Sequence, residues 1–372
     1  MGFLRLRLRL SPERTRHLVA AAFIAALVGL PNAAAAQTEP PGVHQRPHAA
    51  PAPTPDAPAV PADTTQLPIT RIDDPATPDT AIGADLMDID QVTHRLYVSN
   101  HNSDGVDVFD VSGATPTYIT TIGGLGGAEG IATAPDLNKA YAATPSGALA
   151  VIDANPASAA DDTVIASVQV AASGLDSLEY DPADHKVYVT VPGENTIGVV
   201  DTDTNALIKT FTGLPSGLEQ PRYNSADGML YVVVRDANML LQFDPSTDVL
   251  VRQTELSVEC GPNGLAINPA NELALLGCST QHTVFWDLAQ WQMSRVVDNV
   301  GSGDAAIYIP SVDRFMFAAQ GFHRGPVIGF FDGNGQFLTN VPTTTISHQI
   351  AFDETNRMVY TVVGPLGAFR LP

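Results

Sequence analysis

The most informative stretch of this 372-residue chain is Asp90-Gln91-Val92-Thr93-His94-Arg95-Leu96-Tyr97-Val98-Ser99, followed after a polar segment by Val106-Asp107-Val108-Phe109-Asp110. The position of Tyr97 recurs at steps of 44, 47, 43, 43, 42 and 43 residues, at Tyr141, Tyr188, Tyr231, Ala274, Met316 and Val359. The closing aspartate recurs independently, as Asp110, Asp153, Asp201, Asp244, Asp287 and Asp332. Two markers that keep one period indicate an internal repeat.

Each repeat has the pattern of four short β-strands. In the third copy they are expected at Leu178–Tyr180, Lys186–Val191, Thr196–Asp201 and Ala206–Phe211, where residues alternate with period two and β-branched or aromatic side chains are frequent. One four-stranded sheet cannot bury both of its faces, whereas several arranged radially can. The seven repeats therefore predict an all-β fold, a seven-bladed β-propeller of four-stranded antiparallel blades over residues 66–372.

The last repeat lacks one strand, and the N-terminal side of the first repeat offers a replacement. The seventh copy ends with Gly367-Ala368-Phe369-Arg370, which is its third strand. An isolated segment, Leu67-Pro68-Ile69-Thr70-Arg71-Ile72, precedes the first copy and resembles fourth strands such as Phe337-Leu338-Thr339-Asn340-Val341. We expect it to pair into the last blade and close the ring, because the blade would otherwise expose an unpaired edge.

These repeats resemble the YVTN-repeat, or YncE-like, family of seven-bladed propellers. The resemblance is carried by Val187-Tyr188-Val189-Thr190-Val191 with Asn195-Thr196-Ile197-Gly198-Val199-Val200-Asp201, and by Arg95–Asn100 and Gly228–Val232. Leu273–Leu276 and Phe315–Phe317 depart from the Tyr-Val pattern. The resemblance implies a propeller over residues 66–372 and an exported bacterial protein. It implies no single activity, because lactonases, lyases and binding proteins share this architecture.

The N-terminus has the composition of an export signal over residues 1–36. An apolar run of 13 residues, Leu18 to Leu30, follows a basic region and precedes small residues suited to cleavage near Ala36. A membrane anchor is the alternative, but this run is short for a span. Residues 37–65 are rich in Pro, Ala and Thr, which predicts a linker. We therefore expect a periplasmic or secreted protein.

The propeller segment is strongly acidic. Removing residues 1–36 takes away five arginines and one glutamate, so 14 basic and 39 acidic residues remain, a net charge of −25. Such a surface repels DNA, RNA and anionic membranes. We expect no nucleic-acid partner and no membrane span, and a monomer that meets a small molecule or a protein.

The two cysteines, Cys260 and Cys278, both belong to the fifth repeat. We expect the strands Leu265–Ile267 and Leu273–Leu276 to be joined by a turn near Pro269-Ala270. If Leu265 then pairs with Leu273, Cys260 stands opposite Cys278 at a separation that suits a disulfide. Export permits oxidation. We predict a structural disulfide, with a reduced pair or a redox or metal-binding pair as the alternatives.

The repeated aspartates are expected to have a structural role. Each ends a third strand and precedes a turn, as in Asp201-Thr202-Asp203-Thr204-Asn205. An aspartate there accepts hydrogen bonds from backbone N–H groups two residues further on. A ligand that used all six would have to contact six blades at once. We therefore predict turn caps rather than a binding site.

A second set of acids points to function. Propeller loops before first strands lie at one mouth of the central channel, together with the loops that join second to third strands. About twelve residues before each repeat position stand Asp85, Glu129, Asp176, Glu219 and Asp304, while Asn263 and His348 take similar places in the other two copies. Like charges held together raise one another's pKa unless a cation neutralises them. A hydrated acidic rim is the simpler interpretation of these residues, and a metal or cationic-ligand site is the functional one.

Histidines and arginines accompany these acids on the predicted mouth face. The histidines are His101, His282, His323 and His348, and the arginines are Arg222, Arg235 and Arg324. Imidazoles with carboxylates suit Zn²⁺, Cu²⁺ or Ni²⁺, whereas carboxylates with an amide suit Ca²⁺ or Mg²⁺. The metal hypothesis places one divalent ion among His101, His323, His348, Asp176 and Asp304. Arginines could instead hold a carboxylate or phosphate, or pair with the acids.

Three functions remain open from the sequence. The chain contains no GxSxG, HExxH, Walker, EF-hand or haem-attachment motif, so no residue is identified as a nucleophile. We favour an exported, non-catalytic propeller that binds a small ligand, metal ion or protein at the mouth face. The alternative is a lactonase- or lyase-type enzyme in which a mouth metal polarises a carbonyl and His101, His323 or His348 moves a proton. A tethered scaffold is the third.

Overall fold

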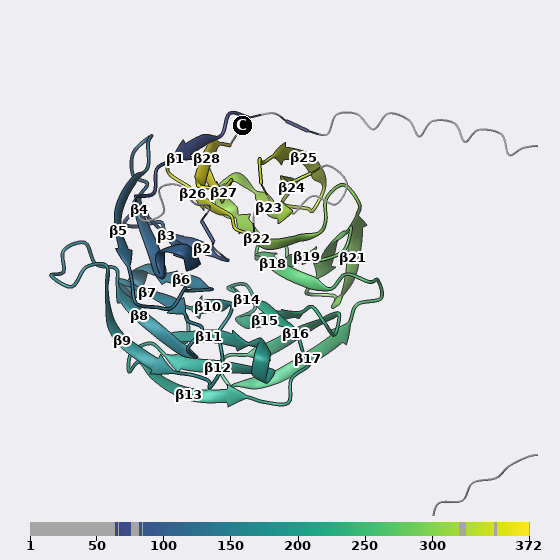
Figure 1. Ribbon diagram of the computed structural model, residues 1–372. Coiled ribbons are helices and arrows are strands. Elements are labelled where there is room, and N and C mark those ends of the chain that lie inside the picture. Colours follow the sequence, from purple (N-terminus) through teal and green to yellow (C-terminus); the bar gives the residue numbers. More distant parts are fainter. Residues whose placement is uncertain are drawn as a thin grey trace, which may run out of the picture. The chain divides into compact units, whose positions relative to one another are not determined.

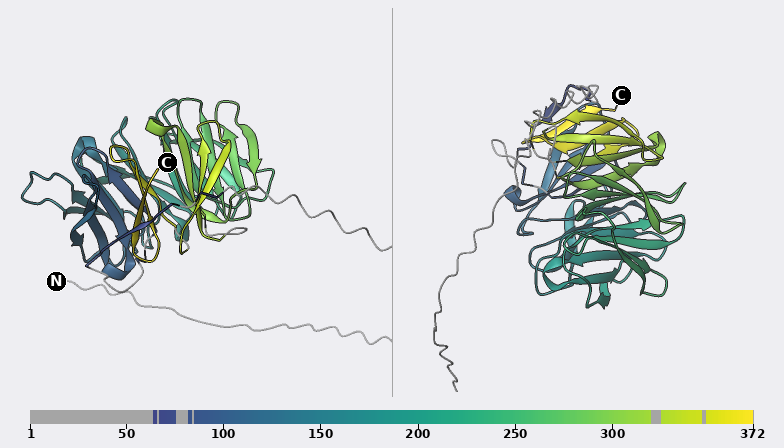
Figure 2. Two further views of the ribbon diagram at one scale, coloured as in Figure 1. Left: turned by 90° about the horizontal axis from the view of Figure 1, so that it is seen from above. Right: turned by 90° about the vertical axis from the view of Figure 1, so that its right-hand side faces the viewer.

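The computed structural model describes residues 64, 65, 67–75, 82, 83, 85–319, 325–345 and 348–371. Within them, seven four-stranded antiparallel sheets surround a central channel (Figure 1). Seen edge-on, this ring is a flattened disc (Figure 2). The predicted seven-bladed β-propeller is confirmed.

The inner half of each blade consists of its first two strands. The first strands, which line the channel, are β2 (Met87–Asp90), β6 (Ile131–Ala134), β10 (Leu178–Asp181), β14 (Leu218–Asn224), β18 (Pro262–Asn268), β22 (Gly303–Ile309) and β26 (Ala351–Asp353). The second strands are β3 (Arg95–Asn100), β7 (Lys139–Ala143), β11 (Lys186–Val191), β15 (Met229–Val234), β19 (Leu273–Cys278), β23 (Arg314–Ala319) and β27 (Met358–Val362).

The outer half consists of the third and fourth strands. The third strands are β4 (Gly105–Asp110), β8 (Ala148–Asp153), β12 (Thr196–Asp201), β16 (Met239–Asp244), β20 (Thr283–Asp287), β24 (Val327–Asp332) and β28 (Leu366–Arg370). The fourth strands are β5 (Thr117–Ile122), β9 (Thr163–Gln169), β13 (Ala206–Phe211), β17 (Val249–Glu255), β21 (Gln292–Val297), β25 (Phe337–Pro342) and, from the N-terminal side, β1 (Thr70–Ile72). Four 3₁₀ turns are η1 (His101–Ser103), η2 (Pro135–Leu137), η3 (Pro192–Glu194) and η4 (Pro310–Val312).

The ring is closed by the N-terminal segment, as predicted. Strand β1 pairs antiparallel with β28, with Thr70 opposite Ala368 and Ile72 opposite Leu366. The paired part is three residues long, shorter than the predicted segment 67–72, although Leu67 and Ile69 still pack against the apolar core of the last two blades. The last blade thus takes its outer strand from the other end of the propeller (Figure 1).

Of the predicted N-terminal regions, the structure describes only residues 64 and 65. The export segment, residues 1–36, lies outside the described residues, as does most of the predicted linker. At the linker's end, Thr65 donates its N–H to the carbonyl of Asn340 in β25 (2.8 Å). In the part of the chain that the structure describes, no helix is long and apolar enough to span a membrane.

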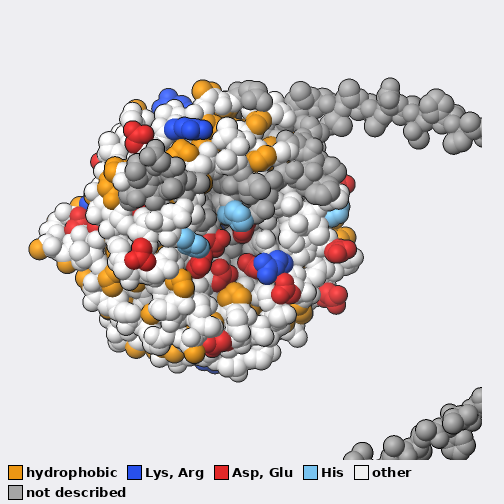
Figure 3. Space-filling model, viewed as in Figure 1, with side chains coloured by type: hydrophobic (Ala, Val, Ile, Leu, Met, Phe, Trp, Pro, Cys, Tyr) orange, Lys and Arg blue, Asp and Glu red, His pale blue; other side chains and the backbone are white. Residues whose placement is uncertain are grey.

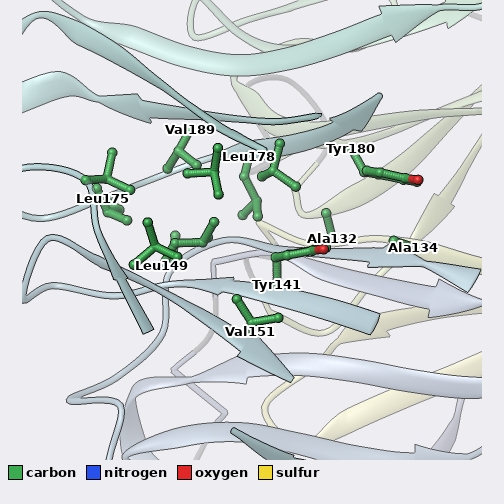
Figure 4. Packing of buried hydrophobic residues seen from close by; sticks show 14 of the residues in the cluster. Ala132, Ala134, Tyr141, Leu149, Val151, Leu175, Leu178, Tyr180 and Val189 are labelled. Carbon is green, nitrogen blue, oxygen red and sulfur yellow. The ribbon is translucent and has the colours of Figure 1, made fainter. Parts of the chain in front are cut away.

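The apolar core lies between the blades rather than at the axis. Seven clusters of buried side chains each join two neighbouring sheets. Between the second and third blades, for example, Tyr141 and Val151 face Leu178 and Val189 (Figure 4). The repeated tyrosines Tyr97, Tyr141, Tyr188 and Tyr231 are fully buried, which explains why that position keeps a large apolar body.

The six repeated aspartates cap turns as predicted. Each accepts a hydrogen bond of 2.7–2.9 Å from a backbone N–H two or three residues further on; the acceptors are Asp110, Asp153, Asp201, Asp244, Asp287 and Asp332. Hydroxyl and N–H donors in these turns lower the pKa of Asp110, Asp201 and Asp244. These carboxylates therefore have the structural role of accepting hydrogen bonds within their turns.

Cys260 and Cys278 form the predicted disulfide, with their Cα atoms 4.6 Å apart. The predicted register is wrong, however, because Leu265 pairs with Leu276 and not with Leu273. Four residues, 269–272, join the strands, and a β-bulge near the start of β18 takes up part of the shift. The bulge brings the thiols together in spite of the different pairing.

Candidate functional site

The five acids predicted at the channel mouth come together in the structure. Asp85, Glu129, Asp176, Glu219 and Asp304 are all half-buried. The other four are all close enough to Asp85 to act on its charge. Figure 3 shows the result as a group of acidic side chains over the channel, with histidine and basic side chains beside it. The five acids come from the first four blades and the sixth.

Backbone contacts between blades hold these acids in place. Leu86 donates its N–H to the carbonyl of Glu129 (3.2 Å), and Ala305 donates to that of His348 (3.1 Å). At two further junctions a glycine makes room: a Cβ on Gly130 would overlap the carbonyl oxygen of Asp176, and one on Gly264 would overlap that of Asp304. The ring of acids is therefore built by close packing of neighbouring blades.

Burial and mutual repulsion make these carboxyl groups weak acids. Burial, followed by repulsion from Asp304 and Asp176, raises the pKa of Asp85 well above its ordinary value. The same causes raise the pKa of Asp176 to about 7 and that of Glu219 to about 8. Arg235, 2.7 Å from Glu219, opposes part of the rise. A bound cation would stabilise the ionised carboxylates and thus displace protons.

The tightest group at the mouth is Asp85, Asp304 and His348. One possible ligand atom from each lies within 4.8 Å of the others. His348 Nδ1 is 2.8 Å from Asp304 Oδ2, and this hydrogen bond raises the pKa of the imidazole. The three residues belong to the first, sixth and seventh blades, which are contiguous in the ring. An imidazole with two carboxylates is a donor set that suits first-row transition metals such as Zn²⁺.

The other predicted histidines are distributed differently. His101, in η1, places Nε2 2.7 Å from Glu129 Oε2 and so belongs to the mouth. His282 instead pairs with the exposed Asp298 at 2.7 Å, as an isolated couple. His323 lies outside the described residues, as does Arg324. Of the predicted metal ligands, the compact group contains His348 and Asp304, while Asp176 stands close enough to repel Asp304.

Two further predicted ligand-binding residues, Arg222 and Asn263, lie on first strands rather than in the loops before them. Arg222 belongs to the channel wall, because β14 begins already at Leu218. Its guanidinium is 3.4 Å from Glu179 of the neighbouring blade. Asn263, in β18, donates to the carbonyl of Gly303 at 3.4 Å, and its Oδ1 is buried without a partner among the described residues. The difference arises because these first strands begin earlier than the pattern indicated.

Sequence reasoning missed the charged residues inside the channel. Asp88 and Glu179 stand, like Arg222, nine residues before the repeat position. Burial raises the pKa of Asp88, and raises that of Glu179 to about 7. Gln220, fully buried, accepts from Arg222 (3.3 Å) and approaches Asp304 with its Nε2 (3.5 Å), so it joins the channel wall to the mouth. The same nine-residue spacing would have revealed this inner set.

No family model matches this sequence, and no curated protein sequence is similar to it. The fold is similar to solved structures. One of them, described as the "Crystal Structure of Mitotic Checkpoint Complex", matches with a TM-score of 0.65 at 16% sequence identity, over 88% of this chain and 99% of that chain. At this identity, the likeness concerns the propeller fold alone.

Proposed function

We propose that this protein is a binding protein that holds a divalent cation at the mouth of its central channel. Asp85, Asp304 and His348 would be the ligands, with Asp176 as a further neighbouring charge. The YVTN-like repeats and the export-signal composition of residues 1–36 support a location in the bacterial periplasm or outside the cell. The ion and its carboxylate surroundings would hold a small ligand or a partner protein; that the similar solved structure is a complex supports the latter.

One observation carries this proposal: the donor atoms of three residues from three blades lie within 4.8 Å of one another. Two carboxylates there repel each other, and Asp176 and Glu129 add to that repulsion. Coulomb repulsion between close, half-buried charges becomes attraction for a cation placed among them. The imidazole favours Zn²⁺ or another transition metal over Ca²⁺ or Mg²⁺.

The test uses chelator-treated mature protein titrated with Zn²⁺, Cu²⁺, Ni²⁺, Ca²⁺ and Mg²⁺ in a calorimeter and in melting experiments. Zn²⁺ should bind and raise the melting temperature, because an ion that binds only the folded state stabilises it. Asp304→Asn and His348→Gln should each abolish this effect. His282→Gln is the matched control, since His282 and Asp298 form a similar 2.7 Å pair that belongs to no three-ligand group among the residues that the structure describes. If no ion binds, or if both mouth variants keep wild-type affinity, the proposal fails.

An enzyme is the second candidate, favoured by the number of donors. Three protein ligands leave coordination positions open for water or substrate, as in catalytic zinc sites. His101 and Glu129, joined at 2.7 Å next to this group, could move a proton. Zinc-loaded protein should then hydrolyse or open simple lactones, and His101→Gln should abolish turnover while zinc binding persists. Absence of turnover with a panel of lactones would leave the binding function alone.

A further inference from the structure

A cavity of about 390 Å³ occupies the channel behind the mouth acids. Its wall is made by the first strands of all seven blades. It extends from Leu86, next to the mouth, to Gln91 and Glu354 in the turns of the opposite face. Its volume is within the range of small-molecule sites. None of the residues assigned above to the cation site belongs to its lining.

One cation and one anion stand side by side in the wall of this cavity. Arg222 Nη1 lies 3.4 Å from Glu179 Oε2, which is long for a charged hydrogen bond. About a fifth of each side chain remains accessible, 20% for Arg222 and 23% for Glu179. Arg222 also donates to the carbonyl of Pro221 (2.8 Å), to Gln220 Oε1 (3.3 Å) and to the carbonyl of Ala306 (3.4 Å), and Glu179 accepts from the N–H of Tyr223 (3.1 Å). Three of the four Arg222 bonds are 3.3 Å or longer, so a ligand carboxylate could replace them with shorter ones. Both charges are thus positioned by the backbone but not saturated by each other.

A third charged residue of the wall, Asp88, already has hydrogen-bond donors around its carboxylate. Asp88 accepts hydrogen bonds of 2.8 Å from the N–H of Ile89 and from both the N–H and the hydroxyl of Thr133. Most of the remaining lining is apolar: Ile89, Ile267, Ile307, Ile309, Ile350 and Phe352. Ala132, Ala266 and Ala351 are also part of the wall, and their short side chains leave space in the channel. Most of these apolar side chains are buried between the blades, so the cavity combines one adjacent pair of opposite charges with a mixed wall in which Ile307 is half-buried.

We propose that this cavity binds an α-amino acid with an apolar side chain. Its carboxylate would lie on the Arg222 guanidinium, which can donate two parallel hydrogen bonds to such a group. Its ammonium would lie on Glu179, and its side chain would bury apolar surface against Ile307, which is half-buried in the wall. A ligand with a single charge would satisfy one of the two wall groups and be repelled by the other. Adjacent opposite charges in the wall thus select adjacent opposite charges in the ligand.

The test is calorimetry of the mature protein, kept in chelator, with L-phenylalanine and L-leucine as probes. Both should bind, whereas phenethylamine and 3-phenylpropionate, which lack one charge each, should bind at least about tenfold more weakly. Glu179→Gln and Arg222→Gln should abolish binding of the amino acids. Glu354→Gln, at the exposed edge of the cavity, is the matched control and should keep it.

Three results would overturn the proposal. The first is no binding of either amino acid at millimolar concentration. The second is equal binding of a singly charged analogue, which needs only wild-type protein and so does not depend on how the variants fold. The third is unchanged affinity in folded Glu179→Gln. Because zinc ligands at the mouth and amino-acid ligands in the channel are different residues, Asp304→Asn should lose zinc and retain phenylalanine, which separates this proposal from the cation site.

Discussion

Two glycines determine how closely the mouth carboxylates approach one another. Gly130 and Gly264 each lie against the carbonyl oxygen of an acid in the next blade, Asp176 and Asp304 respectively. Any side chain at these positions would push the neighbouring first strand outward. The electrostatic property of the mouth therefore depends on residues that carry no charge and would not be recognised as part of a binding site.

Gly264→Ala should weaken zinc binding without touching a ligand. The new Cβ would displace the backbone of Asp304 from Asp85 and His348, and overpacking of this kind costs about 1–3 kcal/mol of stability. Denaturant unfolding and zinc calorimetry measure the two effects. Gly123→Ala is the control, because a Cβ there meets nothing within 4 Å. Full zinc affinity in Gly264→Ala would show that the mouth geometry does not depend on this contact.

Asp176 gives the mouth a pH dependence whose sign can be worked out. Burial and the neighbouring Asp304 raise its pKa from 3.8 to about 7 in the folded protein. The stability linked to this raised pKa is complete below about pH 4 and is lost as the pH rises through about 7, because the folded state then gives up the extra proton. In chelator, Asp176→Asn should therefore be more stable than the parent at pH 8, by about 1–3 kcal/mol.

Denaturant unfolding at pH 4 and pH 8 measures that difference. At pH 4 the two proteins should be nearly equally stable, since the aspartate is then protonated in the folded state and about half-protonated in the unfolded state. Asp184→Asn, an exposed position, should change neither value. A variant that is less stable than its parent at pH 8 would show that Asp176 contributes hydrogen bonds worth more than the repulsion it suffers.

At the scale of single elements, the disulfide is the strongest local constraint. It closes a loop across the hairpin of β18 and β19, with the cysteines 18 positions apart in the sequence. The chain-entropy account assigns about 3 kcal/mol to a loop of this size. The variant with serine at both positions should lose about that much, as measured by denaturant unfolding without reductant. Unreduced peptide mapping of the parent is the control, and two alkylated free thiols in the native protein would contradict the bond.

Strands were predicted from sequence better than their pairings. In the third blade, three of the four expected ranges agree with β11, β12 and β13 at both ends, because the period and alternation act within one repeat. The Cys260 hairpin was predicted with the wrong register, because turn length and bulges depend on neighbouring blades. Six blades carry a β-bulge between their third and fourth strands that the repeat pattern does not indicate.

The candidate site was predictable in composition but not in geometry. The repeat period alone brought the five acids to one mouth. It could not separate His348, which pairs with Asp304, from His282, which pairs with Asp298 elsewhere. His348 precedes a first strand and His282 precedes a third strand, and the loops before both kinds of strand are expected on the same face. Glu179 and Arg222 share one spacing before the repeat position, but that spacing does not show how close the two side chains lie across neighbouring blades.

At the scale of the whole molecule, stability is shared among seven similar interfaces and one closing strand. Deleting residues 37–72 should remove β1, including the buried Ile72, and expose the edge of β28. The loss of this burial and of the strand pairing should cost roughly 2–4 kcal/mol. Deleting only residues 37–62 should cost far less. Equal melting temperatures for the two truncated proteins would show that the closing strand does not hold the ring.

The closing strand also determines how the ring responds to a mechanical load. Because β1 and β28 are antiparallel with Thr70 opposite Ala368, the chain leaves this pair towards both termini at the same end. A force applied between the termini would therefore peel the two strands apart one residue pair at a time, like a zipper, instead of shearing all their hydrogen bonds together. Resistance to such a force is set by the rate of opening rather than by total stability. A propeller anchored at one end and bound to a partner at the other would open first at this junction, while its seven cores remained packed.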